Sequence, residues 1–227
     1  MPFMHFSLEL SLLILESVLL VATIILLIFS LKEGRGRDKL IMQVERATRV
    51  LSRHEYFISV TDTMMDAEAE VVGSITGRFP VGDDSKRTKE VANTIEKLVQ
   101  SNVKVRYLLP KFHDRLHVAW LYRRAGAEVR FGSDPHLHDF RYVVADDRMA
   151  VIGIPEGTGA QEATKRGYRI ASQGLSKLLK RDFDDNWEGA TTFEEQVQET
   201  IAHTGMTLQA LSREFQIDPA DLNNIAS

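Results

Sequence analysis

The chain has 227 residues, of which 44% are hydrophobic and 26% are charged, and it contains no cysteine. This composition excludes collagen-like, disulfide-stapled and wholly disordered proteins. The formal charge of −4 is unevenly spread, because residues 1–31, 32–181 and 182–227 carry net charges of −2, +7 and −9. The sequence therefore has three parts: an almost uncharged beginning, a basic middle and an acidic end.

The first part contains an apolar run over residues 10–31. At 1.5 Å per residue this run is about 33 Å long, enough to cross a hydrocarbon core of roughly 30 Å. A cleavable signal peptide would need a basic segment before the run and a small-residue cleavage site after it, and neither is present. Bases follow the run from Lys32 to Lys39 and none precedes it. The positive-inside rule thus predicts a single-pass inner-membrane protein, anchored by residues 1–37, with its N-terminus outside and its C-terminal part in the cytoplasm.

Glu16 is the one charged residue inside this run. An ionised carboxylate near the centre of a bilayer costs roughly 2.5 to 3.5 kcal/mol. Two explanations stay open: Glu16 lies near the interface because the apolar core begins at Ser17, or it contacts a partner helix within the membrane. Glu9 falls on roughly the same helical face, which favours a polar contact.

The basic middle part alternates between helix and strand patterns. Its first half predicts, in order, an amphipathic helix over 38–54, a buried strand over 56–61, a helix over 65–79, a loop over 80–89 and an amphipathic helix over 89–102. Its second half predicts a strand over 103–110, a helix over 112–126, a strand over 127–131, a hairpin of 141–147 with 149–156, a strand over 167–172 and a helix over 175–187. This order predicts an α/β domain over residues 38–189, with a mixed β-sheet flanked by helices.

The segment DFRYVVADDRMAVIG, residues 139–153, resembles the motif of phospholipase D-type domains. The wider resemblance covers about residues 56–188. In that family a strand carries His-x-Lys-x4-Asp, Gly-Ser-x-Asn follows after six residues, and two such halves form one active site. The resemblance implies a histidine that attacks phosphorus, a second that acts as an acid, and Lys and Asn side chains that hold the phosphoryl oxygens.

Only two positions of the motif match, Asp146 and Gly153. The other four carry Asp139 for His, Arg141 for Lys, Ile154 for Ser and Glu156 for Asn. Carboxylates at two of these positions would repel a phosphodiester. The resemblance therefore implies a degenerate domain, similar to the phospholipase D-like domains of TrmB-type regulators, in which the fold serves ligand sensing or dimer contacts.

An active alternative depends on His138, which precedes Asp139. A one-residue bulge in the strand would place His138 and Arg141 on one face. A homodimer would then hold His138, Arg141 and Asp146 in a phosphodiesterase or phospholipase site, although Ile154 and Glu156 would remain unsuited to it.

Four histidines form a weak candidate for a metal site. His113 and His117 have the i, i+4 spacing of metal-binding helices, and His136 and His138 could add ligands from an extended segment. An exposed pair at the start of a helix explains His113 and His117 equally well. We expect no metal and no other cofactor.

The last part, residues 190–227, predicts a tail of three short helices over 193–205, 206–215 and 218–227. Thr207 and Asp218 are predicted N-caps, with Pro219 at a first helical position. The last two helices resemble a helix-turn-helix, but the recognition helix has no base and the acidic end opposes a phosphate backbone, so no nucleic acid is expected. The tail is expected to dock on a protein, or on the basic part of the same or another copy.

These features together predict a membrane-anchored, non-catalytic phospholipase D-like protein. It would act as a scaffold, accessory or sensory subunit of a membrane-associated assembly, with the lipid bilayer and protein partners or self-association as its contacts. Two alternatives remain: the homodimeric phosphodiesterase, and a membrane-tethered regulator that acts through the helical tail.

Overall fold

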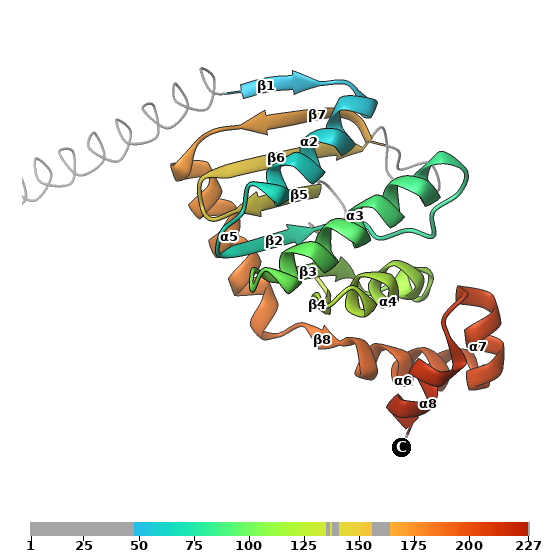
Figure 1. Ribbon diagram of the computed structural model, residues 1–227. Helices are drawn as coiled ribbons and strands as arrows, with labels where there is room; N and C mark the ends of the chain where they lie inside the picture. Colours follow the sequence, from blue (N-terminus) through green and yellow to red (C-terminus); the bar gives the residue numbers. More distant parts are fainter. Residues whose placement is uncertain (1–47, 135–136, 138–140, 156–163, 227) are drawn as a thin grey trace, which may run out of the picture. The chain divides into compact units, whose positions relative to one another are not determined.

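Strands with apolar residues on both sides build one central sheet with both faces covered (Figure 1). The computed structural model describes residues 48–134, 137, 141–155 and 164–226. Its eight strands form one sheet in the order β1-β7-β6-β5-β2-β3-β4-β8. Strands β2, β3 and β4 are parallel, and all other neighbours are antiparallel. The predicted mixed sheet flanked by helices is confirmed.

The strands are β1 (Thr48–Leu51), β2 (Glu70–Ser74), β3 (Lys104–Pro110), β4 (Glu128–Gly132), β5 (Arg141–Ala145), β6 (Met149–Pro155), β7 (Thr164–Ile170) and β8 (Thr191–Thr192). The helices are α2 (Arg53–Met65), α3 (Asp83–Gln100), the 3₁₀ helix η1 (His113–Arg115), α4 (Leu116–Arg124), α5 (Gln173–Glu188), α6 (Phe193–Thr204), α7 (Leu208–Phe215) and α8 (Pro219–Ala226).

Helices α2, α3 and α4 cover one face of the sheet and α5 covers the other (Figure 1). Side chains alternate between the faces along each strand. In β5, Val143 packs in the larger cluster under α2 to α4, whereas Tyr142 and Val144 pack against α5. The adjacent Val71 and Val72 of β2 divide between the two clusters in the same way.

Two predictions at the start of this unit are wrong. Residues 48–51, predicted to be helical, form strand β1, and residues 56–61, predicted as a strand, lie inside α2. Helix α2 begins at Arg53 because Ser52 and Glu55 form a capping box. In this box each side chain accepts a hydrogen bond from the other's backbone N–H. Tyr56, Val60 and Met64 then follow one buried helical face.

The next two predictions also need correction. The predicted helix over 65–79 contains β2 instead, a strand whose residues after Glu70 are all buried. It runs between β5 and β3 in the middle of the sheet, where both faces are covered. Its residues are therefore apolar on both faces and do not show the alternation of apolar and polar residues expected of a half-buried strand. The loop predicted over 80–89 is shorter in the structure, because α3 begins at Asp83. Asp83 and Asp84 lie in the first turn of this helix.

The later elements are confirmed within a few residues at their ends. These are the remainder of α3, strands β3 and β4, helix α4, the hairpin of β5 and β6, strand β7, helix α5 and the three tail helices. Gly126 follows α4 with a φ of 98°. The Thr207 side chain accepts from the N–H of Ala210 and that of Asp218 from the N–H of Ala220, as expected of N-caps.

The predicted membrane anchor and Glu16 lie outside the described residues. No helix within the described ranges is long and apolar enough to cross a membrane. Contacts divide the chain into residues 1–46 and 47–227, and every described residue belongs to the second unit. The predicted domain limits at 37/38 and 189/190 stay predictions.

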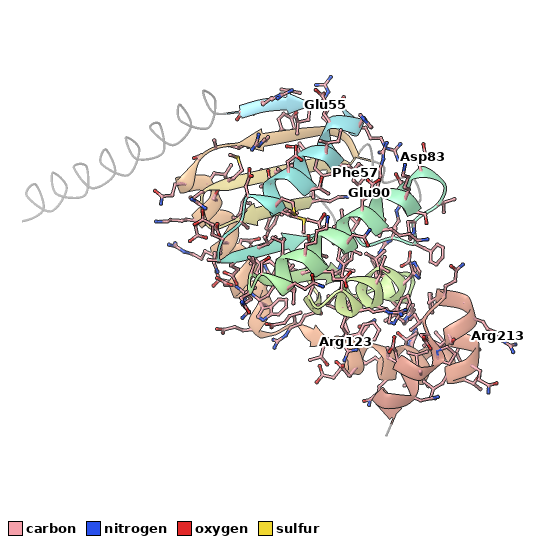
Figure 2. The ribbon with its side chains drawn as sticks, in the orientation of Figure 1. Glu55, Phe57, Asp83, Glu90, Arg123 and Arg213 are labelled. Atoms are coloured by element: carbon pink, nitrogen blue, oxygen red, sulfur yellow. The ribbon has the colours of Figure 1, made fainter. Side chains whose placement is uncertain are left out.

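The helical tail packs on the sheet's own helices. Strand β8 extends the sheet beside β4, and α6 follows it directly. Apolar side chains of the tail join the cluster that contains α4: Phe193, Val197, Leu211, Phe215, Ile217 and Leu222. Arg123 of α4, labelled in Figure 2, pairs with Glu194. Lys111 pairs with Glu199 at 2.7 Å. The acidic tail thus docks on the basic part of its own chain.

Asp146 anchors the β5–β6 hairpin to the strand beside it. Asp146 and Asp147 have φ values of 48° and 55°, as a type I′ turn requires. The Asp146 carboxylate accepts hydrogen bonds from the backbone N–H groups of residues 68–70, at 2.8 to 2.9 Å, and one from Arg148 at 2.8 Å. Burial raises the pKa of Asp146, but these bonds outweigh it and lower the pKa to about 2.

Gly153 and Gly167 face each other across β6 and β7, and the ring of Tyr56 lies against both. A Cβ atom at Gly153 would lie 2.8 Å from Tyr56 Cζ, and one at Gly167 would lie 2.6 Å from Tyr56 Cδ2. Helix α2 therefore approaches the sheet at a place where two glycines leave room for an aromatic ring.

Asp146→Asn is expected to lower the free energy of unfolding by about 2 kcal/mol at pH 7. Because the folded pKa, about 2, lies below the ordinary 3.8, the wild-type contribution is present above about pH 4 and is lost as the pH falls towards 2. Urea unfolding between pH 2 and 7 measures both effects. Asp147→Asn keeps all four bonds and should retain the wild-type pH dependence. Equal acid sensitivity of wild type and Asp146→Asn would refute this role.

Gly153→Ala is expected to lower the free energy of unfolding by about 1 to 3 kcal/mol, since the new methyl group overlaps the Tyr56 ring. Adding Tyr56→Leu should recover part of the loss, because the two residues are in contact and their effects are not additive. Gly189→Ala is the matched control, as nothing lies within 4 Å of its Cβ position. Additive losses in the double variant would contradict the packing argument.

Candidate functional site

Two positions of the phospholipase D motif lie at the two ends of strand β5. Arg141 is its first residue, and Asp146 follows its last. A strand of five residues is about 16 Å long. Asp146 is bound to the backbone of residues 68–70, whereas Arg141 lines a pocket at the opposite end. The structure therefore does not bring Arg141 and Asp146 into one site. The role of Asp146 is structural, because its carboxylate binds the backbone that leads into β2.

The remaining motif positions divide between described and undescribed residues. Gly153 pairs with Arg141 in register and supports Tyr56. Ile154 is 46% exposed, and its side chain offers no hydrogen bond to a phosphoryl group. His138, Asp139 and Glu156 lie outside the described residues. The bulge at His138 and the repulsion by the two carboxylates accordingly stay predictions.

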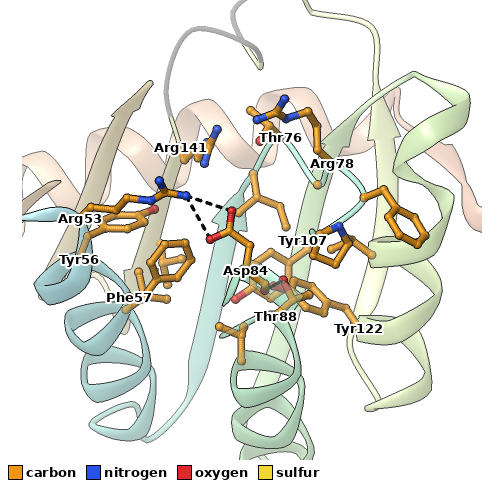
Figure 3. Close-up of a pocket in the computed structure, with 18 residues that line it drawn as sticks. Arg53, Tyr56, Phe57, Thr76, Arg78, Asp84, Thr88, Tyr107, Tyr122 and Arg141 are labelled. Atoms are coloured by element: carbon orange, nitrogen blue, oxygen red, sulfur yellow. Dashed lines mark hydrogen bonds and ion pairs between the residues drawn. The ribbon is translucent and has the colours of Figure 1, made fainter. Parts of the chain in front are cut away.

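Arg141 lines a pocket of about 130 Å³ between helices α2, α3 and α4 and the edge of the sheet (Figure 3). Three arginines take part in its lining: Arg53, Arg78 and Arg141. Its apolar wall is largely aromatic, with Tyr56, Phe57, Phe79, Tyr107 and Tyr122. The pocket thus combines guanidinium groups with a wall of aromatic rings.

The charge of this lining is predominantly positive. Among the described residues that line the pocket, Asp84 is the single carboxylate. Arg53 donates from Nη2 to both oxygens of Asp84, at 3.2 and 3.1 Å. Three guanidinium groups against one carboxylate give these described residues a net charge of +2.

Different elements bring these side chains together. Arg53 is the first residue of α2, Asp84 lies in the first turn of α3, and Arg141 begins β5. Arg78 comes from the loop after β2, which turns at Gly77 with a φ of 61°. A Cβ at Gly77 would lie 2.3 Å from Leu109 Cδ2, so this turn also needs glycine for space.

The tyrosine hydroxyls of the pocket stay protonated. Burial raises the pKa of Tyr56 to about 12, although Arg141 lowers it. Burial likewise raises the pKa of Tyr107 and Tyr122 above their usual range. The Tyr107 hydroxyl donates to Met64 Sδ at 3.4 Å. These phenols therefore cannot act as bases near neutral pH, and the proton of Tyr107 is already donated to Met64.

His113 and His117 each contact the helical tail through Nδ1. His113 lies in η1, with Nδ1 3.1 Å from Thr200 Oγ1 and its ring stacked on His203. His117 lies in α4, with Nδ1 2.8 Å from the Phe215 carbonyl oxygen. Within the described part of the chain, no three or more His, Asp or Glu side chains are grouped to hold a metal ion. His136 and His138 lie outside that part.

Of the three pocket arginines, sequence reasoning singled out only Arg141. Arg53 was placed inside a predicted helix and Arg78 inside another, so neither was expected beside Arg141. The Ser52 to Glu55 capping box was the available signal for Arg53, because it puts that residue at a helix start. Asp84 and the aromatic wall carry no local signal, since long-range packing alone unites them.

No protein-family model matches the chain, and no curated protein matches its sequence. Comparison with solved structures gives matches at low sequence identity. Nuc from Salmonella typhimurium, a phospholipase D family member, matches with a TM-score of 0.50 and 14% identity, over 64% of this chain and 96% of Nuc. NucT from Helicobacter pylori matches with a TM-score of 0.49 and 10% identity, over 64% of this chain and 98% of NucT.

TrmBL2, an archaeal chromatin protein described with a novel mode of DNA binding, matches with a TM-score of 0.48 and 18% identity, over 72% of this chain and 63% of TrmBL2. That description concerns TrmBL2, and the expectation that this chain binds no nucleic acid stays a prediction. At 14% identity the likeness to Nuc is one of fold alone. It supports a phospholipase D-like fold for the described unit, as the resemblance of residues 56–188 implied.

Proposed function

We propose that the chain is a membrane-anchored, non-catalytic phospholipase D-like protein that senses a small anionic molecule in the Arg141 pocket. The observation that carries the proposal is the group of three arginines around a pocket with one described carboxylate. In this role the chain is a sensory subunit of a membrane-associated assembly.

The residue types at the motif positions support binding without hydrolysis. An arginine is always charged near neutral pH and presents a planar fork of donors that suits phosphate and carboxylate oxygens. It cannot serve as the nucleophile or as a general acid. The aligned positions for the catalytic His, Ser and Asn carry Asp139, Ile154 and Glu156. The chain thus keeps a cation for the anion and lacks the aligned groups that would attack it.

The size and wall of the pocket indicate the class of ligand. Its volume, about 130 Å³, is close to that of an engineered cavity of about 150 Å³ that binds benzene. The aromatic wall favours an apolar body, and the arginines favour an anionic head. We therefore propose a ligand with one phosphate or carboxylate group on a body about the size of a single ring.

The anchor and the partners rest on the sequence. The apolar run over 10–31 and the bases after it support a single-pass position in the inner membrane, with the described unit in the cytoplasm. Self-association is part of the proposal, because two halves pair in the family that the chain resembles. The homodimeric phosphodiesterase, with His138 and Arg141, is the competing function that the following experiments separate.

Arg141→Ala is expected to weaken binding of phenyl phosphate by about tenfold to a hundredfold, which is the loss of one charge-assisted hydrogen-bonding group. Titration calorimetry on the full chain in a nonionic detergent measures the affinity. Arg141→Lys should lose less, because it keeps the charge without the planar fork. Arg213→Ala is the control, since Arg213 is an exposed residue of α7 (Figure 2).

Two results would overturn this proposal. Binding of phenyl phosphate that is equally strong in the wild type and Arg141→Ala would place the ligand elsewhere, and absence of binding at millimolar concentration would remove the anion site. Cleavage of a generic phosphodiester by the wild type, lost in His138→Ala, would establish the competing enzyme instead.

The anchor predicts that the full chain stays in the membrane fraction during extraction with alkaline carbonate and leaves it only with detergent. Removal of residues 10–31 should release the chain, because the buried apolar run supplies the attachment. Fractionation followed by immunodetection measures both. Extraction of the full chain by carbonate alone would show that residues 10–31 do not span the bilayer.

A further inference from the structure

Helix α4 stands between the pocket and the docked tail. Val118 and Tyr122, one helical turn apart, line the pocket. On the tail side, Trp120 donates from Nε1 to Asp221 of α8 at 2.6 Å, and His117 bonds to Phe215. A helix of nine residues therefore contacts both the ligand pocket and the tail.

His117 connects the two sides directly. Its ring centroid lies 4.6 Å from that of Phe79, a residue of the pocket wall. On the other side, its Nδ1 lies 2.8 Å from the carbonyl oxygen of Phe215, at the end of α7. Because a carbonyl oxygen only accepts, Nδ1 carries the proton and donates it. The tail thus holds the orientation of the ring on which Phe79 packs.

The loop that carries Phe79 has glycines at both ends. Gly77 and Gly82 have φ values of 61° and 60°. No atom lies within 4 Å of a Cβ position at Gly82, and Val81 beside it is 79% exposed. Glycine permits several backbone conformations at such positions. The ring contact between Phe79 and His117 is one contact through which α4 can hold this loop in its pocket-forming position.

We infer that the docked tail organises the Arg141 pocket through His117, so that anion binding and tail docking favour each other. The inference rests on the proposed anion binding. Linkage requires that each event strengthens the other by the same factor. The tail is then the output of the sensor: a ligand holds α7 and α8 against α4, and its loss makes them easier to release.

His117→Phe separates the two contacts of this positioning residue. The new ring can still pack on Phe79, but it cannot bond to the Phe215 carbonyl. The affinity for phenyl phosphate is expected to fall about threefold to tenfold, the usual effect of one neutral hydrogen bond. Trp120→Phe is the matched variant, because it removes a bond to the tail without removing the Phe79 support. It should speed hydrogen exchange in the tail and change ligand affinity less.

Hydrogen exchange of residues 208–223 in the full chain, in nonionic detergent with and without saturating phenyl phosphate, tests the coupling. In the wild type and in Arg213→Ala, the ligand should slow exchange in α7 and α8 by about threefold to tenfold. In His117→Phe this protection should disappear. Arg141→Ala should abolish the protection by the ligand, measured as the ratio of exchange with and without phenyl phosphate in the same variant, so it decides the question even if His117→Phe folds poorly.

The outcomes separate this inference from the proposed function. If phenyl phosphate binds through Arg141 but exchange in the tail does not respond, the coupling is wrong and the anion sensor stands. If protection persists in Arg141→Ala, the ligand acts at another place and the coupling is wrong. If the wild type does not bind phenyl phosphate, both the proposed function and the coupling fail.

Discussion

The register between β5 and β2 is the constraint on which the rest of the structure depends. The two strands are antiparallel, with Val71 opposite Ala145 and Ser74 opposite Tyr142. Asp146 holds this register by accepting hydrogen bonds from the three N–H groups at the start of β2. A slip of one residue would exchange the faces of the strand. It would turn Arg141 and Val143 away from the pocket and towards the face that α5 covers.

The same register gathers the pocket residues at one edge of the sheet. Because β2 and β5 are antiparallel, the end of β2 lies beside the beginning of β5. The loop with Arg78 therefore meets Arg141, and α2 and α3 begin at this edge with Arg53 and Asp84. The partial positive charges of two helix N-termini add to the guanidinium charges there. The hairpin anchored at the opposite edge thus fixes the strand from which Arg141 reaches the pocket.

The sequence predicted the elements whose signals are local and missed those that depend on neighbours. The hairpin at Asp146 and Asp147, the caps at Thr207 and Asp218 and the amphipathic α3 carry their own patterns. Strand β2 has no such pattern, because a central strand is apolar on both faces and resembles a helix segment. Of the site, Arg141 could be found from the motif. Arg53 and Arg78 could not, because they reach it from elements whose identity was mistaken.

The proposal combines an arginine that can bind an anion with motif positions that lack the aligned catalytic residue types. An enzyme gains rate only from contacts that are stronger in the transition state than in the bound ground state. Fixed guanidinium groups bind the ground state of an anion well, and in the proposed non-catalytic protein that binding energy would not be converted into reaction. It is available to stabilise whatever conformation the ligand favours. In this chain His117 contacts Phe79 in the pocket wall, and the tail holds the His117 ring through the Phe215 carbonyl. Under the proposed function, the phospholipase D-like unit would need two things as a sensor: an anion-binding pocket and a packed segment beside it whose docking the ligand can favour. The Arg141 pocket and the tail behind α4 are the parts of the structure that would serve these roles.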